Sequence, residues 1–345
     1  MSRWVLSLMG IVLLGSLLIF VVSASAGGLD AASFYKNKAI DLTCVNAPGA
    51  SADIFARMSQ PFIQKYTGAG AVIVANRRGA GGLEGYNFVY RAEANGLHIG
   101  IGTRTAIPLN EIMDEPGVAY DATKYLYLLG VERSRNILSV KTAGRYNSLA
   151  DLKAGKNLKL AATSPAGNLA MAGVTAIYAL GLDAKVVSGF KGPTECGVAL
   201  LQGEIDAWAC PAESALSLFK GGQIKGLCIL APERDKAFPN IPTITELISL
   251  QGDRKEVIEL WGPLVQGRIF FAPPGMPGDR VEFLRKAFSD VAKDPGFAAG
   301  VEKLFGYKGI DVDTGEQVLK EMKFLIDRKT RFKALFEDLF NRYRA

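Results

Sequence analysis

The sequence contains a single histidine, His98, in 345 residues. A metal centre built from several histidines is therefore excluded, and any Ser-His-Asp or Cys-His catalytic arrangement would have to use that one side chain. The cysteines at positions 44, 196, 210 and 228 form no CxxC pair, which argues against a zinc ribbon or a thioredoxin-type site. GxGxxG, GxxxxGK(S/T) and G-x-S-x-G motifs are also absent. The sequence thus predicts no cofactor, no metal and no catalytic residues.

Strong charge of one sign is missing as well. The 40 Lys and Arg exceed the 34 Asp and Glu by six, without basic runs, so the sequence predicts no nucleic-acid partner. Hydrophobic residues make up 49% of the chain and prolines number only 15, which is typical of an ordered globular protein. The length is enough for about two domains.

The first 26 residues have the features of a secretory signal. Arg3 is followed by an apolar stretch over residues 4–22 and by the small-residue tripeptide Ala24-Ser25-Ala26. We expect cleavage after Ala26. An uncleaved anchor is the alternative, because the apolar stretch is long enough to span a bilayer. Both alternatives place the folded part outside the cytoplasm, where disulfides are permitted.

The even number of cysteines allows two disulfides outside the cytoplasm. Cys196 and Cys210 flank one predicted helix-to-strand step, so they are the first candidates for a pair. Four small buried thiols are the alternative.

Strands and helices alternate after residue 38. The pattern predicts strands at 39–45, 71–75, 98–102, 158–162, 185–187, 205–209 and 226–230, and helices at 52–66, 170–180 and 194–201. This alternation favours α/β layers around mostly parallel sheets. We expect two lobes with crossings near 130–136 and 229–232: residues 27–132 plus 231–345 form lobe 1, and residues 133–230 form lobe 2.

The C-terminal region is predicted to be helical. Thr314 and Gln317 are spaced as a capping box, and apolar residues recur at helical spacing from Val318 to Tyr343. We expect this extension, about residues 315–345, to pack on lobe 1. A membrane-surface or partner-binding helix is the less favoured alternative.

Glycine-rich turns at strand-to-helix junctions carry the strongest functional signal. They lie at residues 49–53, 79–82 and 164–168. Exposed N–H groups and the positive end of a helix dipole make such turns suitable for anions. Because the carboxyl ends of parallel strands share one edge of a sheet, these turns predict a common crevice.

Two charged residues near these turns are candidate ligand contacts. Asp53 either contacts a ligand or holds its own loop. Arg104 follows the third predicted strand and could form a bidentate fork with a carboxylate. His98 is predicted to be structural.

These residues resemble the tripartite tricarboxylate transporter substrate-binding (receptor) proteins. The segments that carry the resemblance are Gly49-x-Ser51-x-Asp53-x-x-Ala56-Arg57, Val74-x-Asn76-Arg77-x-Gly79-Ala80-Gly81-Gly82, Phe190-Lys191-Gly192, Leu201-x-Gly203-Glu204-Ile205-Asp206, Pro239-x-Ile241-Pro242-Thr243, Trp261-Gly262 and Ala272-Pro273-Pro274-Gly275-Met276-Pro277. The resemblance covers about residues 38–310.

The resemblance implies a periplasmic, monomeric receptor with a two-lobed, type II-like binding-protein fold. Such a receptor closes on a small organic acid (a di- or tricarboxylate or an aromatic carboxylate) and delivers it to membrane transporter subunits. Carried over by position, and with Arg104 added from its own context, the predicted ligand-binding residues are Gly49, Ala50, Ser51, Asp53, Gly79, Ala80, Gly81, Gly82, Thr103, Arg104, Ser164 and Gly167.

The sequence departs from the family pattern at several positions. Ala50 replaces a usual glycine, Ala75 a usual glutamate, Arg78 a usual proline and Phe190 a common tyrosine. Ala50 would narrow the contacts that the first loop can make with a ligand.

Two other functions remain open on the sequence. One is a ligand sensor of the same fold that reports to a signalling partner. The other, less favoured, is an exported α/β hydrolase or transferase, against which the lone His98 and the missing catalytic motifs argue.

Overall fold

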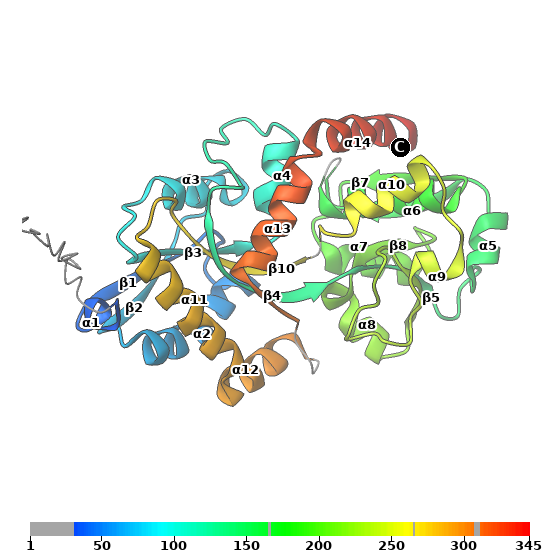
Figure 1. Cartoon of the computed structure of the whole chain (residues 1–345). Coiled ribbons are helices and arrows are strands. Elements are labelled where there is room, and N and C mark those ends of the chain that lie inside the picture. The colour runs from blue at the N-terminus through cyan, green and yellow to red at the C-terminus, as the bar shows by residue number, and fades with distance from the viewer. Residues whose placement is uncertain (1–30, 165–166, 265, 307–310) are drawn as a thin grey trace, which may run out of the picture.

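The computed structural model describes residues 31–164, 167–264, 266–306 and 311–345. The predicted signal segment, residues 1–26, lies outside the described residues. Two lobes lie side by side (Figure 1), and each is built of sheets flanked by helices. Among the described helices, none has the length and apolar character needed to cross a membrane.

A six-stranded sheet forms the centre of the first lobe, with strand order β11-β4-β10-β3-β1-β2. Its strands are β1 (Ala39–Cys44), β2 (Ala71–Asn76), β3 (His98–Thr103), β4 (Leu126–Ser134), β10 (Gln266–Ala272) and β11 (Val312–Thr314). The pairs β1–β2 and β1–β3 are parallel, whereas β10 is antiparallel to both β3 and β4. The sheet is therefore mixed, where the sequence predicted mostly parallel pairing.

Helices cover both faces of this sheet. They are α1 (Ala31–Tyr35), α2 (Ser51–Thr67), α3 (Leu83–Arg91), α4 (Ala106–Ile112), α11 (Gly278–Lys293), α12 (Pro295–Phe305) and α13 (Gly315–Ile326), with a 3-10 turn, η1, at Ala80–Gly82. Successive strand residues point to opposite faces. Accordingly, Phe270 packs in the apolar cluster with α2, α11 and α12, while Phe271 packs with α3, α4 and α13.

The second lobe contains the sheet β8-β5-β9 and the parallel pair β6-β7, joined by a bridge between Leu160 and Ala207. Its strands are β5 (Asn136–Lys141), β6 (Leu158–Ala162), β7 (Ala184–Ser188), β8 (Trp208–Pro211) and β9 (Ile224–Ile229). Its helices are α5 (Leu149–Ala154), α6 (Asn168–Leu180), α7 (Pro193–Gln202), α8 (Leu216–Lys220), α9 (Ile244–Leu247), α10 (Asp253–Trp261) and α14 (Lys329–Tyr343), with a 3-10 turn, η2, at Ala212–Ala215.

The second crossing between the lobes differs from the prediction. The first lies where expected, between β4 and β5. The return runs from α10 to β10 and not near residues 229–232, because α10 packs on α6 and buries Val257, Ile258 and Trp261 in the core of the second lobe. Residues 231–264, which the sequence placed in lobe 1, therefore belong with lobe 2.

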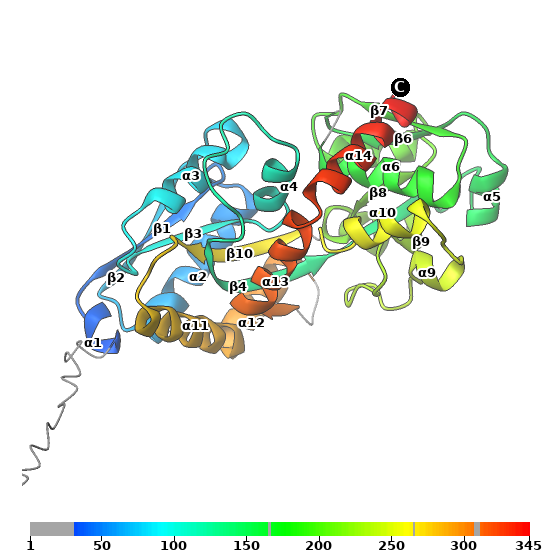
Figure 2. The same cartoon turned by 45° about the horizontal axis from the view of Figure 1, so that its top comes forward.

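The predicted C-terminal helix is two helices, one on each lobe. The capping box of Thr314 and Gln317 is present at the start of α13, which packs on β4 and α4 of the first lobe. The chain then turns, and α14 packs on α6 and β7 of the second lobe (Figure 2). Beyond the end of α14, the last residue of the sequence, Ala345, donates its N–H to the Val186 carbonyl at 3.0 Å. The C-terminus thus links the two lobes.

The four cysteines are buried free thiols, which agrees with the alternative to a Cys196–Cys210 disulfide. Burial raises the pKa of Cys196 to about 11 and that of Cys228 to about 12. The thiolate is the reactive form, so the thiols of Cys196 and Cys228 are unreactive at neutral pH.

Removal of one buried aromatic ring tests the packing of α14. Phe336 is fully buried and lies 6.0 Å from the Trp261 ring, centroid to centroid. Phe336→Ala is expected to lower the free energy of unfolding by about 3–5 kcal/mol because it leaves a cavity. Urea unfolding measures the loss. Glu337→Ala, on the exposed side of the same helix, serves as the control and is expected to change it by no more than about 0.5 kcal/mol; equal effects would contradict the packing.

Candidate ligand-binding cleft

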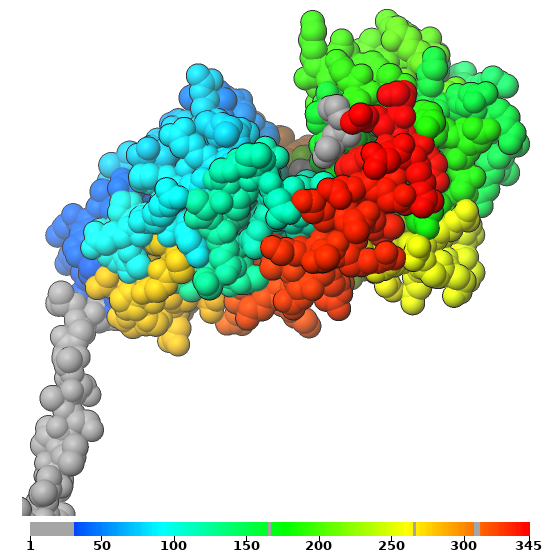
Figure 3. All heavy atoms as spheres, turned by 90° about the horizontal axis from the view of Figure 1, so that it is seen from above, coloured from blue at the N-terminus to red at the C-terminus, as the bar shows by residue number. Residues whose placement is uncertain are grey.

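The strand ends that carry the first two glycine loops share the edge of the first sheet that faces the second lobe. β1, β2 and β3 are mutually parallel, and β3 runs in the same direction as β4 because β10 is antiparallel to both. β4 continues into β5 of the second lobe. Figure 3 shows a hollow between the first lobe (blue to cyan) and the second lobe (green). His98 begins β3 and so lies at the opposite edge.

In the first glycine loop, Asp53 holds the backbone in place. Its side chain is buried, and its carboxylate accepts hydrogen bonds from the Gly49 N–H (2.9 Å), Arg57 Nε (3.1 Å) and Asn76 Nδ2 (2.8 Å). Burial opposes ionisation, but the hydrogen bonds from Arg57, Gly49 and Asn76 outweigh it, so the pKa of Asp53 is lowered. Asp53 is thus occupied by its own loop, which agrees with the structural alternative for this residue.

The loop leaves other groups for a ligand. Ser51 is exposed and begins α2, where the first helical N–H groups have no acceptor within the helix. Its hydroxyl accepts a hydrogen bond from Arg268 Nη2 at 2.8 Å, so the hydroxyl proton remains available to a ligand. Gly49 has φ +78°, a left-handed conformation that favours glycine.

The second glycine loop packs beside the end of β1, the strand that leads into the first loop. Gly82 has φ +100°, and a Cβ there would lie 3.2 Å from the Val45 carbonyl oxygen. Gly79 through Gly82 form the turn into α3, with Ala80 and Gly81 exposed. The two loops are therefore neighbours, as the sequence predicted.

Thr103 ends β3 beside these loops and is partly buried. Its N–H donates to the Tyr86 hydroxyl at 3.1 Å. Burial raises the pKa of Tyr86 to about 12, so this hydroxyl stays neutral.

The second lobe contributes the start of α6. A Cβ at Gly167 would lie 2.3 Å from Ser164 Oγ, so a larger residue there would require the Ser164 hydroxyl to rotate away. The following residue, Asn168, has an enclosed side-chain amide with no hydrogen-bond partner among the described residues. Ser164 and Gly167 thus lie together, and Asn168 is a polar group that the sequence did not single out.

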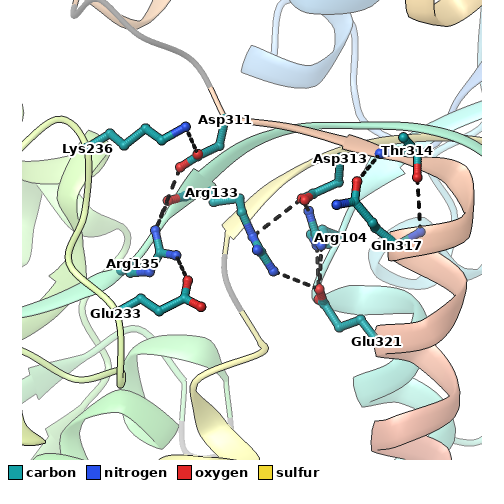
Figure 4. Close-up of polar contacts among 10 residues, drawn as sticks. All are labelled: Arg104, Arg133, Arg135, Glu233, Lys236, Asp311, Asp313, Thr314, Gln317 and Glu321. Carbon is teal, nitrogen blue, oxygen red and sulfur yellow. Dashed lines mark hydrogen bonds and ion pairs between the residues drawn. The ribbon is translucent and has the colours of Figure 1, made fainter.

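Arg104 does not lie with the glycine loops, which corrects its predicted role. Its side chain is 1% exposed. Nη1 donates to Asp313 Oδ2 at 2.5 Å, and Nε and Nη2 donate to the Glu321 carboxylate (Figure 4). Because β11 and α13 supply both of these acceptors, the guanidinium is already paired and buried, and its fork is not presented to a ligand.

A cavity of about 720 Å³ lies beside this cluster. Its lining residues come from the crossing strand, the 231–233 segment, α10 and α13, and none except Arg104 is a predicted ligand contact. Arginines in its wall are paired: Arg133 with Asp313 and Glu321, and Arg135 with Glu233. The cavity is therefore separate from the loop-lined cleft.

Besides Arg57, a second cation contacts the first loop: Arg268 on β10. It is 4% exposed and bonds Ser51 as described above, and its Nη1 lies 3.4 Å from Glu132 Oε2. Sequence reasoning missed Arg268 because it lies in an apolar strand 217 positions from Ser51, and no motif surrounds it. Among the described residues, no group of three or more His, Cys, Asp or Glu side chains could hold a metal ion.

Two lobes with a loop-lined cleft between them are typical of the class of solute-binding proteins. Similarity to known sequences and solved structures agrees with this class. The sequence profile of the tripartite tricarboxylate transporter family receptor, TctC, matches residues 55–340. The chain belongs to this family. Protein BugT of Bordetella pertussis is 26% identical over 241 residues, which cover 66% of this chain and 72% of BugT.

Solved structures show the same fold. A TctC solute binding protein from Polaromonas, without ligand, has a TM-score of 0.72 and 18% identity over 88% of this chain and 99% of its own. An R. palustris protein with adipate has a TM-score of 0.64 and 18% identity over 86% of this chain and 97% of its own. These likenesses establish a periplasmic binding-protein fold.

The role of Asp53 can be tested by its pH dependence. Asp53→Asn removes the charge that Arg57 and the Gly49 N–H bind, and is expected to cost about 1.5–3 kcal/mol of unfolding free energy at pH 7. A lowered folded-state pKa stabilises the native state above the unfolded pKa of about 3.9, and this contribution disappears as pH falls through the folded value. In urea unfolding, the free energy of unfolding of Asp53→Asn is expected to differ strongly from that of wild type at pH 7 and only slightly at pH 3. Asp327→Asn, at an exposed position, is the control. The same difference between Asp53→Asn and wild type at both pH values would contradict the role of the Asp53 charge.

A second pair of variants tests Arg104. Arg104→Ala leaves the carboxylates of Asp313 and Glu321 with only the more exposed Arg133 as a cationic partner, and is expected to lower stability by about 3–5 kcal/mol. Arg331→Ala removes an arginine that also binds two carboxylates, Asp253 and Glu256, but is 48% exposed, so a loss of at most about 1 kcal/mol is expected. Thermal and urea unfolding compare the two. A stable Arg104→Ala protein that has lost ligand affinity would restore Arg104 to the binding site.

Proposed function

We propose that this chain is an extracytoplasmic receptor that captures a small organic acid between its lobes and delivers it to membrane transporter subunits. The ligand class is a di- or tricarboxylate or an aromatic carboxylate. The observation that carries the proposal is the placement of two glycine loops, with exposed Ser51, Ala80 and Gly81, at the sheet edge facing the other lobe. The chain is expected to act as a monomer in the periplasm, with the signal removed after Ala26.

Uncharged donors are suited to this task. Backbone N–H groups at helix starts and the Ser51 and Ser164 hydroxyls can replace the water around a carboxylate. Closure of the lobes is driven by the additional contacts that the closed state makes with the ligand. The ligand is then bound and released chemically unchanged.

Family membership and fold support the receptor function, and the adipate held by the R. palustris protein supports a carboxylate ligand. An enzyme is disfavoured, since His98 lies at the far edge of the sheet from the loops. A sensor of the same fold would use the same cleft, so ligand binding tests the shared part of both functions.

Ligand screening is the direct test. The mature chain, residues 27–345, is heated with mono-, di- and tricarboxylates and aromatic acids. A ligand at 100 times its dissociation constant should stabilise the protein by about 2.7 kcal/mol, which raises the melting temperature. Turnover of a hydrolysable substrate with no stabilisation by any acid would overturn the proposal.

Substitution of two serines on one helix then tests where the ligand binds. Ser51→Ala removes a hydroxyl from the loop and is expected to weaken binding about fivefold to tenfold, the equivalent of one hydrogen bond. Ser59→Ala, two turns farther along α2, removes a hydroxyl that donates to the Phe55 carbonyl in the buried interior, and is expected to leave affinity unchanged. Calorimetric titration with the acid found in the screen measures both. Equal affinities for wild type and Ser51→Ala would place the ligand elsewhere.

A further inference from the structure

One glutamate of the second lobe reaches the guanidinium that holds the ligand loop. Glu213 lies in η2, directly after β8. Its Oε2 is 3.7 Å from Arg268 Nη2, the same nitrogen that donates to Ser51 Oγ at 2.8 Å. Glu213 and the first ligand loop therefore meet at one atom, although they belong to different lobes.

The position of Glu213 is set by the crossing strand. Its N–H donates to Ser134 Oγ at 3.1 Å, and Ser134 is the last residue of β4 before the chain enters the second lobe. Residues next to the hinge move least when lobes rotate. Glu213 is thus expected to stay beside Arg268 in the closed state as well.

The charge of Glu213 is only partly compensated. Arg268 is engaged through Nη1 with Glu132 and through Nη2 with Ser51, and the 3.7 Å separation from Glu213 exceeds hydrogen-bond distance. The Glu213 side chain is 20% exposed. By contrast, the carboxylate of Asp53 accepts three hydrogen bonds, from Gly49, Arg57 and Asn76. Glu213 thus presents a partly exposed negative acceptor beside the guanidinium that contacts the first ligand loop.

We propose that Glu213 binds a protonated amine of the ligand, so that the favoured ligand is an amino acid. This inference rests on the proposed receptor function and, among small organic acids, favours amino acids over the di- and tricarboxylates named there. The carboxylate of the ligand lies on the donors of the glycine loops, and its ammonium group lies against Glu213. A second carboxylate in place of the ammonium meets like charge, which selects against dicarboxylates.

Matched ligand pairs test the inference by calorimetric titration of the mature protein. Each ω-amino acid is compared with the dicarboxylate of the same chain length: β-alanine with succinate, 4-aminobutanoate with glutarate, and 5-aminopentanoate with adipate. Aspartate and glutamate extend the series to α-amino acids. The best amino acid is expected to bind about tenfold or more tightly than its paired diacid, the effect of one charge-assisted contact.

Variants of Glu213 assign the preference to this residue. Glu213→Gln keeps the shape, and is expected to weaken amino-acid binding about tenfold while diacid binding stays equal or improves. Glu213→Asp keeps the charge on a shorter side chain and is expected to fall between wild type and Glu213→Gln. Glu204→Gln removes an exposed charge from the same lobe and is expected to change neither. Circular dichroism and melting curves confirm that the variants fold.

The outcomes separate the two proposals. Tighter binding of diacids, or a Glu213→Gln effect equal for both series, overturns the amino-acid inference and leaves the receptor function standing; an equal effect assigns Glu213 to a contact between the lobes. The inference also falls if other organic acids bind but no amino acid does. If no acid of any class binds, both the amino-acid inference and the proposed receptor function are wrong.

Discussion

The buried guanidinium of Arg104 is the constraint on which the arrangement of the lobes depends. A charge at 1% exposure is tolerated only if carboxylates surround it, and here they come from residues more than 200 positions away, Asp313 and Glu321. This requirement holds β11 against β4 and α13 across the sheet (Figure 4). With α13 held there, the chain can continue into α14 on the other lobe, so one ionic cluster ties the C-terminus to both halves of the molecule.

The crossing strands separate two regions of different chemistry. On one side, the cleft offers uncharged donors from glycine loops, with Asp53 and Arg268 engaged by their own neighbours. On the other side, the cavity is lined by Arg133 and Arg135, which already pair with carboxylates, and by other charged side chains that include Lys320 and Arg328. In the cleft, helix and loop N–H groups lack acceptors and are available to an anion, whereas an anion beside Arg133 or Arg135 would have to displace the carboxylates that these arginines bind.

Local patterns predicted much of the fold. The strand and helix alternation placed β1, β2, β3, β6, α6 and α7 within a few residues of their observed bounds, and the capping box at Thr314 and Gln317 is present. The glycine loops lie together as expected, because parallel strands bring their carboxyl ends to one edge. The position of the second crossing between the lobes was predicted wrongly. In the sequence, Trp261 is an ordinary apolar residue, and only its packing between α6 and α14 shows that α10 belongs to the second lobe.

What the sequence by itself determined is therefore what short-range physics controls: the elements, their caps, the turns that require positive φ, and from these the class of fold and the loops of the cleft. Only the tertiary structure decided which arginine serves those loops. Arg104 directly follows β3 and Arg268 lies on β10, and these two strands pair directly, with Thr103 opposite Arg268. The Arg104 side chain binds the carboxylates of α13 and β11, whereas the Arg268 side chain binds Ser51. That choice depends on contacts between distant segments, which no local pattern records.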